Sequence, residues 1–305
     1  MSQALRIMPT LLPSEDWASS FQRQLGHKVQ RGVALSHYTS IGIGGPATLF
    51  GRAGSRDELA QMILMASRHD VEVLILDDGR RLLVGDWGFD GFAVRLEGEL
   101  NSVRPQSGGL AVGGACGVGR VLETCLAARI DCSVLAEFQG QVGAAVLRAS
   151  ARQKERLATL VRAVEIVDWS GRSQVLSSLD DLPEHVAAIT RLDLGGPAIL
   201  DAQDVADRVE ARRMLLASRT PSYQNLGAVL RLEDGQSAAR AVQEVGLAGL
   251  SMGPVAIPKT HADTVINLGG ATARDVLDLI DCVAARLYGR LEFTLDPDLR
   301  IVGNL

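Results

Sequence analysis

The chain has 305 residues and a formal net charge of −5, and 47% of its residues are hydrophobic and 22% charged. This composition excludes a disordered chain and, on overall charge, a strongly basic nucleic-acid-binding protein. The length allows a large core divided over two or more domains. The chain has 32 glycines, whereas an average usage of about 7% predicts roughly 21, and this excess suggests a loop-rich, phosphate-binding enzyme.

Targeting and redox features predict a soluble cytoplasmic protein without a metal site. Residues 1–17 lack a basic segment followed by a long apolar run, so no signal peptide is evident. No run of about 18 uncharged apolar residues occurs, so no membrane span is predicted. The four cysteines lack CxxC and Cys/His metal spacing, and we expect reduced, mostly buried thiols at Cys116, Cys125, Cys132 and Cys282.

The first part of the chain alternates predicted helices and strands. Residues 1–34 show no clear motif and are interpreted as a variable lead-in. Ser55 precedes Glu58 by three residues, a capping signature, and one helical face follows at Leu59, Met62, Ile63 and Ala66. A buried β-branched strand is predicted at residues 71–76, followed by a loop at 77–81.

The middle of the chain continues this pattern. We predict a strand at residues 110–113 and a helix at 118–129. Residues 161–169 alternate as a strand, and a Ser-Gly turn leads to a second strand at 173–176, so a hairpin is expected. Helices that alternate with buried strands indicate an α/β fold.

The last third begins after a glycine-proline break at residues 195–197, where we place a domain boundary. A charge-rich amphipathic helix is predicted at residues 203–218 and a strong helix at 273–287. Strand-like segments are predicted at residues 291–295 and 299–302.

Three glycine-bearing loops are candidate ligand sites, at residues 41–47, 76–84 and 139–145. Such loops can present backbone N–H groups to a pyrophosphate, but each is equally compatible with a plain turn or close packing. In the second loop two carboxylates beside Gly79 would repel a phosphate, whereas two arginines would attract it.

Four segments, at residues 38–47, 82–91, 259–276 and 296–303, in this order resemble the motifs of the UDP-N-acetylenolpyruvoylglucosamine reductase (MurB) family. The resemblance extends over about residues 35–303. The resemblance implies a flavoenzyme that uses FAD and NADPH to make UDP-N-acetylmuramate for peptidoglycan. Because the four segments occur in the same order as in the family, the resemblance is a strong indication of the fold.

The resemblance implies an α+β or α/β fold with three parts. After the lead-in of residues 1–34, a PCMH-type FAD-binding domain would span residues 35–200 in two lobes, about 35–96 and 97–200. A MurB-type α/β substrate domain would follow at residues 201–305.

The family's catalytic residues are only partly matched. The serine that protonates the substrate carbanion aligns with Ala228, which has no exchangeable proton. The stabilising glutamate aligns with Asp298, a carboxylate that is one methylene shorter. Arg191 takes the place of the catalytic arginine or is a solvent-exposed side chain.

The flavin-binding motifs differ more strongly from the family. The family's Gly-Gly-Gly-Ser-Asn loop is replaced by Asp-Asp-Gly-Arg-Arg at residues 77–81, so bulky or charged side chains replace small ones where the backbone must approach a pyrophosphate. The resemblance nevertheless places a cofactor site at Gly44, Gly45, Gly79, Arg80, Arg81, Leu82, Gly140, Val142 and Gly143.

Substrate contacts are assigned to two residues, each with an alternative. Arg219 either binds the substrate diphosphate or is a solvated helix end, and His261 either lines the substrate pocket or makes a structural hydrogen bond.

Two functions from different classes therefore remain. The first is a MurB-like protein with lost or weakened reductase activity, which binds a nucleotide-sugar or a protein partner of cell-wall synthesis or division. The second is a divergent but active reductase that depends on FAD and NADPH. A flavin oxidase with the same FAD domain is a third alternative, but no His or Cys flavin-linkage motif is present.

Overall fold

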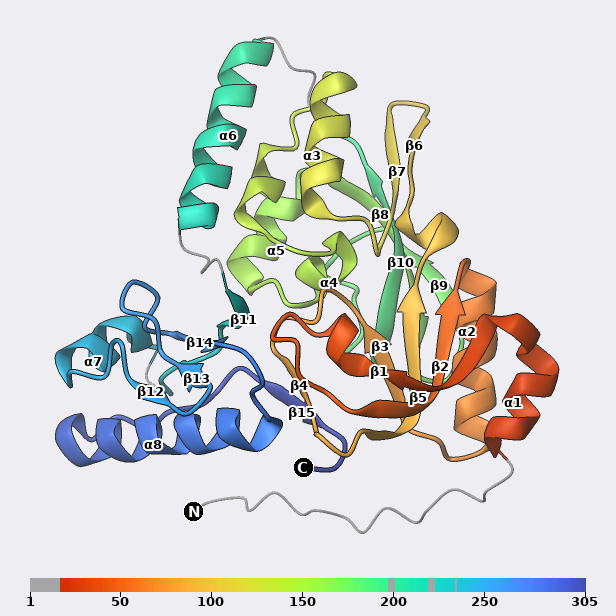
Figure 1. Cartoon of the computed structure of the whole chain (residues 1–305). Coiled ribbons are helices and arrows are strands. Elements are labelled where there is room, and N and C mark those ends of the chain that lie inside the picture. The colour runs from red at the N-terminus through yellow and green to blue at the C-terminus, as the bar shows by residue number, and fades with distance from the viewer. Residues whose placement is uncertain (1–16, 197–200, 219–222, 234) are drawn as a thin grey trace.

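The computed structural model describes residues 17–196, 201–218, 223–233 and 235–305. Figure 1 shows three parts, which are two adjoining lobes and a C-terminal unit beside them. The described residues form sheets of four, five and four strands, together with a two-stranded pair. The predicted α/β architecture, a two-lobed domain followed by a C-terminal α/β unit, is confirmed.

The first lobe is built on a four-stranded sheet in the order β1-β2-β5-β3. Strands β2, β5 and β3 run parallel, and β1 pairs antiparallel with β2. In chain order the elements are α1 (Trp17–Leu25), η1 (Gly26–Lys28), β1 (Val29–Ala34), η2 (Leu35–Tyr38), β2 (Pro46–Ala53), α2 (Arg56–Arg68), β3 (Val73–Leu76), β4 (Leu82–Val84), β5 (Phe89–Leu96) and η3 (Gly98–Asn101).

The second lobe is an antiparallel sheet in the order β6-β7-β10-β8-β9, with short helices beside it (Figure 1). Helix α6 packs against α3 and η4. The elements are β6 (Val103–Gln106), β7 (Gly109–Gly113), α3 (Val118–Ala127), η4 (Ser133–Glu137), α4 (Val142–Leu147), α5 (Ala151–Ala158), β8 (Val161–Asp168), β9 (Ser173–Leu176), β10 (Val186–Leu194) and α6 (Ala202–Ser218).

The C-terminal unit packs α7 and α8 on a sheet in the order β11-β14-β13-β12. Its elements are β11 (Gln224–Ala228), α7 (Ala238–Glu244), β12 (Ser251–Met252), β13 (Val255–Ala256), β14 (Thr264–Asn267), α8 (Ala273–Leu291) and β15 (Arg300–Val302). Strand β15 returns to the first lobe, where it pairs in parallel with β4. Leu83 of β4 also belongs to the C-terminal core, so the two parts share one packed interface.

Most predicted helices form, because their local signals are strong. Ser55 caps α2 by accepting a hydrogen bond from the Glu58 N–H, as the capping signature predicts. The predicted β8–β9 hairpin is confirmed. The prediction of a strand at 291–295 is wrong, because α8 continues to Leu291 and ends where Glu292 adopts a left-handed conformation with φ 57°.

The N-terminal region also contains more structure than its lack of motifs indicated. Helix α1 and strand β1 lie within the segment interpreted as a variable lead-in. Trp17, Phe21 and Leu25 of α1 are buried in the same core as α2. This part of the segment is therefore a packed element of the first lobe.

The prediction that all cysteines are reduced is also wrong. Cys125 and Cys132 form a disulfide between the end of α3 and the loop before η4, with a Cα–Cα distance of 6.1 Å. That distance lies within the usual range for a disulfide, and the tight turn that brings the two residues together could not be read from their spacing. Cys116 and Cys282 are free. No helix among the described residues is long and apolar enough to cross a membrane.

Candidate functional site

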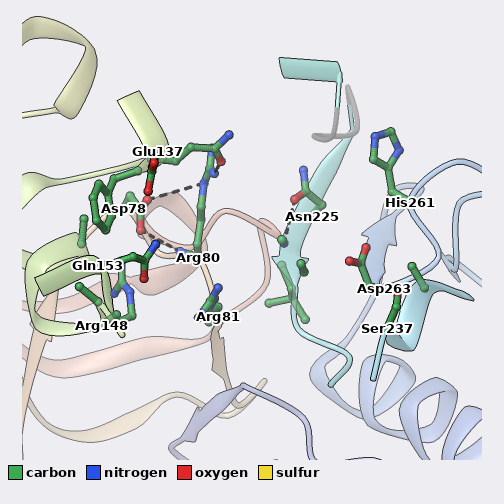
Figure 2. A pocket seen from close by; sticks show the side chains of 18 of the residues that line it. Asp78, Arg80, Arg81, Glu137, Arg148, Gln153, Asn225, Ser237, His261 and Asp263 are labelled. Atoms are coloured by element: carbon green, nitrogen blue, oxygen red, sulfur yellow. Dashed lines mark hydrogen bonds and ion pairs between the residues drawn. The ribbon is translucent and has the colours of Figure 1, made fainter. Parts of the chain in front are cut away.

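A cavity of about 660 Å³ lies between the second lobe and the C-terminal unit. Figure 2 shows Asp78, Arg80 and Glu137 on one wall, and His261 and Asp263 on the other. The wall of the second lobe comes from η4, α4 and α5, and that of the C-terminal unit from β11 and the segment before β14. The volume of the cavity falls within the range of about 300–1,000 Å³ that is usual for small-molecule sites.

The loop after β3 (residues 77–81) contributes charged side chains to this cavity. Its backbone N–H groups already have partners in the chain. The Gly79 N–H donates to the Asp77 carboxylate at 2.9 Å, and the Arg80 N–H donates to the Asp78 carboxylate at 3.3 Å. The Arg81 N–H donates to the Leu226 carbonyl at 3.1 Å. These three donors are therefore satisfied without a ligand.

The loop before α4 is similarly committed to internal hydrogen bonds. The Val142 N–H donates to the Cys116 carbonyl at 2.9 Å, and the Gly143 N–H donates to the Gly114 carbonyl at 2.8 Å. Gly140 has φ 80°, and a Cβ there would collide with the Asp78 carboxylate. The two loops are thus in direct contact at Gly140 and Asp78.

Other glycines of the predicted cofactor site are explained by packing. Gly44 has φ 143° and a Cβ there would lie 2.9 Å from the Val84 Cβ, while a Cβ on Gly45 would collide with backbone atoms of Asp86 and Gly88. Leu82 is buried in β4, where it pairs with Arg300. These positions therefore stabilise the first lobe.

An ion pair and a hydrogen bond join the loop at residues 77–81 to the second lobe. Arg148 at the end of α4 pairs with Asp77 at 2.5 Å, and Arg80 lies 3.6 Å from Asp78 and also donates to Gln139. Burial raises the pKa of the Asp78 carboxyl above its ordinary value, and the Asp77 carboxylate raises it further, while Arg148 and Arg80 oppose the shift. The environment therefore disfavours the charge of Asp78 even though cations surround it.

This raised pKa gives a stability prediction for Asp78→Asn. Because the folded protein binds the Asp78 proton more tightly than the unfolded chain, this group stabilises the fold at low pH and the contribution is lost as the pH rises through the raised pKa. We expect the variant to be more stable than the wild type at neutral pH, and the difference to shrink as the pH falls through the raised pKa and to vanish below about 4, the ordinary Asp pKa. Urea unfolding across this pH range measures the difference in the free energy of unfolding between the variant and the wild type.

Asp181→Asn, at an exposed position, is the matched control and should follow the wild type throughout. An Asp78→Asn variant that is less stable at neutral pH, with a deficit that shrinks on acidification, would show that the ion pairs outweigh burial.

The predicted catalytic positions do not all meet in the cavity. Ala228 is exposed on β11 and lines it. Asp298 lies in an adjoining pocket of about 190 Å³, where Arg81 and Arg231 hold its carboxylate. The Asp298 N–H donates to the Val229 carbonyl at 2.8 Å, which ties that pocket to the strand bearing Ala228.

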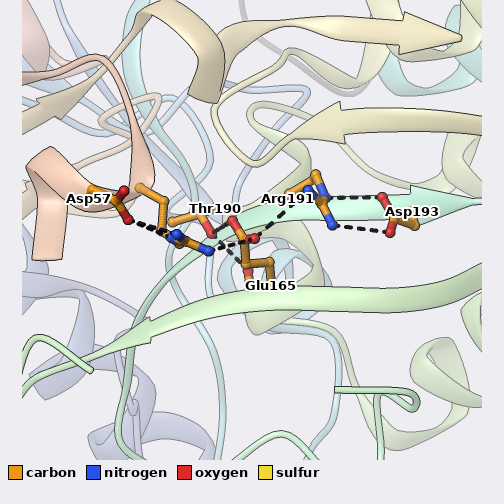
Figure 3. A network of polar contacts seen from close by, with 6 residues as sticks. Asp57, Glu165, Thr190, Arg191 and Asp193 are labelled. Carbon is orange, nitrogen blue, oxygen red and sulfur yellow. Dashed lines mark hydrogen bonds and ion pairs between the residues drawn. The ribbon is translucent and has the colours of Figure 1, made fainter. Parts of the chain in front are cut away.

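Arg191 belongs to a polar network on the sheet of the second lobe (Figure 3). It pairs with Asp193 at 3.1 Å and lies 3.8 Å from Glu165, which also accepts a hydrogen bond from the Thr190 hydroxyl and pairs with Arg56. Arg191 is not among the described residues that line the cavity. This network connects α2 of the first lobe to β8 and β10.

Of the two predicted substrate residues, only His261 lies within the part of the chain that the structure describes. His261 lines the cavity, and its Nδ1 lies 2.8 Å from the Thr260 hydroxyl, so both interpretations of this residue remain compatible with its position. Arg219 lies outside the described residues. Several polar lining residues had not been predicted, among them Arg148, Gln153 and Asn225. The place of Arg148 in the sequence, three residues after the third glycine-bearing loop, is a signal that could have identified it as a candidate ligand-binding residue.

The FAD that the resemblance implies does not fit the loop at residues 77–81. A pyrophosphate at such a loop needs free N–H groups and close approach to the backbone. Here carboxylates of the same loop take the N–H groups of Gly79 and Arg80. Asp78 also fills the space over Gly140.

Comparisons with known proteins agree with the fold. Residues 219–302 match the model of the family "UDP-N-acetylenolpyruvoylglucosamine reductase, C-terminal domain". A reductase of that name from Rubrobacter xylanophilus is 32% identical over 284 residues, 88% of this chain and 94% of that protein. One from Myxococcus xanthus is 29% identical over 299 residues, 92% of this chain and 94% of that protein.

A solved structure gives the same result. The crystal structure of UDP-N-acetylenolpyruvylglucosamine reductase (MurB) from Thermus caldophilus superposes with a TM-score of 0.72 at 26% identity, covering 90% of this chain and 99% of that one. The fold expected from the sequence motifs is thereby confirmed along nearly the whole chain. The chain belongs to the UDP-N-acetylenolpyruvoylglucosamine reductase (MurB) family.

Proposed function

We propose that this protein binds a UDP-linked N-acetylhexosamine in the cavity, in the context of peptidoglycan precursor synthesis, and carries out no flavin-dependent reduction. The observation that carries the proposal is the hydrogen bonding of residues 77–81. The N–H groups of Gly79 and Arg80 and the space over Gly140 are taken by the side chains of Asp77 and Asp78.

The lining of the cavity supports a nucleotide-sugar as ligand. Arg81 reaches it and shares the single Asp298 carboxylate with Arg231, so this cluster keeps a net positive charge that can attract a phosphate group. Gln139, Gln153 and Asn225 add amides that can bond to sugar hydroxyls or a uracil ring. The ligand class also agrees with the names of the relatives, which are reductases of a UDP-linked sugar.

The lack of a proton donor supports the loss of reduction. Ala228 cannot supply the proton that a serine would supply at this position. Two cavity hydroxyls, which also belong to the C-terminal unit, have other roles. Ser237 accepts a hydrogen bond from the Arg240 N–H at the start of α7, and Thr260 is bonded to His261.

The second candidate function is an active FAD- and NADPH-dependent reductase. The identity of 32% to a reductase over 88% of this chain favours it, as does the carboxylate retained at Asp298. In such an enzyme water would have to supply the proton, and the side chains of the loop after β3 would have to rearrange to admit the flavin.

Two measurements on the purified full chain separate these functions. We expect isothermal titration calorimetry to give micromolar binding of UDP-N-acetylglucosamine, and we expect no flavin absorbance. NADPH oxidation in the presence of added FAD and UDP-N-acetylglucosamine enolpyruvate should stay at background, both for the wild type and for Ala228→Ser. Substrate-dependent NADPH oxidation by the wild type would establish the reductase, and no UDP-N-acetylglucosamine binding would refute the binding function.

A further inference from the structure

We propose that Asp77 and Asp78 act as a built-in substitute for a diphosphate, so that the loop at residues 77–81 is an anion cradle filled by its own side chains. This inference deepens the proposed flavin-independent function, because it names what excludes a dinucleotide. It concerns two carboxylates to which no ligand-binding role had been assigned.

The backbone of the loop at residues 77–81 presents two neighbouring N–H groups to carboxylates. A phosphate cradle binds its anion through consecutive N–H groups that point into one space. In this loop the Gly79 N–H donates to Asp77 Oδ1 at 2.9 Å and the Arg80 N–H donates to Asp78 Oδ1 at 3.3 Å. Two neighbouring anionic groups thus bind two neighbouring N–H groups, as the two phosphates of a diphosphate would.

The two carboxylates also face two arginine side chains, those of Arg80 and Arg148. Asp77 Oδ2 pairs with Arg148, and Asp78 Oδ2 lies 3.6 Å from the Arg80 Nε (Figure 2). Two carboxylates facing two guanidinium groups leave no net positive charge on the pairs that Arg80 and Arg148 form. These two arginines are therefore already neutralised by the chain.

The Asp78 side chain occupies the space over Gly140. Asp78 Oδ2 is buried and accepts no hydrogen bond from any described residue. It lies against the α-carbon of Gly140, where even a methyl group would collide with it. A carboxylate oxygen buried without a donor is costly, and in this position it fills the space over Gly140 that an incoming ligand would need.

Removal of the two carboxylates should therefore open the cradle. In Asp77→Gly/Asp78→Gly the N–H groups of Gly79 and Arg80 lose their acceptors, and Arg80 and Arg148 lose their carboxylate partners. We expect this variant of the full chain to bind inorganic pyrophosphate at least about 30-fold more tightly than the wild type, a change of about 2 kcal/mol at 1.4 kcal/mol per factor of ten. Isothermal titration calorimetry measures both, and FAD fluorescence quenching provides a second probe.

The matched control is Asp180→Gly/Asp181→Gly, an adjacent pair of exposed aspartates whose removal changes the net charge equally. It should bind pyrophosphate no better than the wild type. If the cradle variant does not fold, Asp77→Asn/Asp78→Asn keeps the acceptor oxygens and removes the charges, and it should show a smaller gain over the same control.

Equal affinities of a folded cradle variant and the control would overturn the inference. If the wild type nevertheless binds UDP-N-acetylglucosamine without consuming NADPH, the proposed function stands and only the built-in substitute fails. A wild type that binds pyrophosphate as tightly as the cradle variant would also overturn the inference, because its loop would then be open to anions.

Discussion

Replacement of Ala228 by tryptophan is expected to abolish binding of UDP-N-acetylglucosamine. Ala228 is exposed on β11 and lines the cavity. A tryptophan side chain brings about 150–250 Å² of surface and would fill the space that the ligand needs. We expect affinity to fall by at least about 100-fold, which corresponds to about 2.7 kcal/mol, as measured by isothermal titration calorimetry.

The expected loss must come from blockage and not from unfolding. Because Ala228 is exposed, its substitution should leave the thermal midpoint nearly unchanged. Ala128→Trp is the matched control, since Ala128 is exposed at the end of α3 and is not among the described cavity residues. Unchanged affinity in a folded Ala228→Trp variant would place the nucleotide-sugar elsewhere on the protein.

The second large effect concerns Gly88, which holds the C-terminal strand against the first lobe. Gly88 has φ 99°, and a Cβ there would collide with the Pro46 carbonyl oxygen. Its own carbonyl accepts a hydrogen bond from the Asn304 N–H at 2.9 Å. Gly88→Ala therefore adds backbone strain to overpacking, and we expect it to lower the free energy of unfolding by about 3 kcal/mol or more.

A glycine without these constraints provides the comparison. Gly289 lies in α8, and a Cβ there would meet no heavy atom within 4 Å beyond its chain neighbours and the backbone of its own helix. Gly289→Ala should raise the free energy of unfolding by up to about 1 kcal/mol, because alanine favours helix. Urea unfolding of both variants gives the result, and a Gly88→Ala protein as stable as the wild type would mean that the β4–β15 junction adjusts without cost.

Local signals predicted the elements that stabilise themselves. Helix α8 begins with a capping box at Thr272 and Asp275 and follows an apolar period, so its sequence alone indicated it. The β8–β9 hairpin has a turn at Gly171 with φ 77°. Strands β2 and β5 escaped prediction, because each is buried between neighbours far apart in the sequence and lacks a simple alternation.

The candidate site was predicted unevenly for the same reason. The motif order pointed to the loops at residues 77–81 and 139–145, and both adjoin the cavity. The partners of Asp77 could not be predicted, because Arg148 reaches it from another lobe. The position of Arg191 in a network with Glu165 likewise depends on how β8 and β10 pair.

The sequence by itself determined the family, the longer helices, the β8–β9 hairpin, and the replacement of small residues by aspartate and arginine at a phosphate-binding loop. Those properties are encoded in residue type and spacing. Only the tertiary structure decided that Asp77 and Asp78 turn inward to bind the N–H groups of their own loop and that Asp78 lies against Gly140. The N–H donors of Gly79 and Arg80 lie in the same loop as the carboxylates, but Arg148 and Gly140 come from segments distant in the chain, and only the fold brings them to this loop.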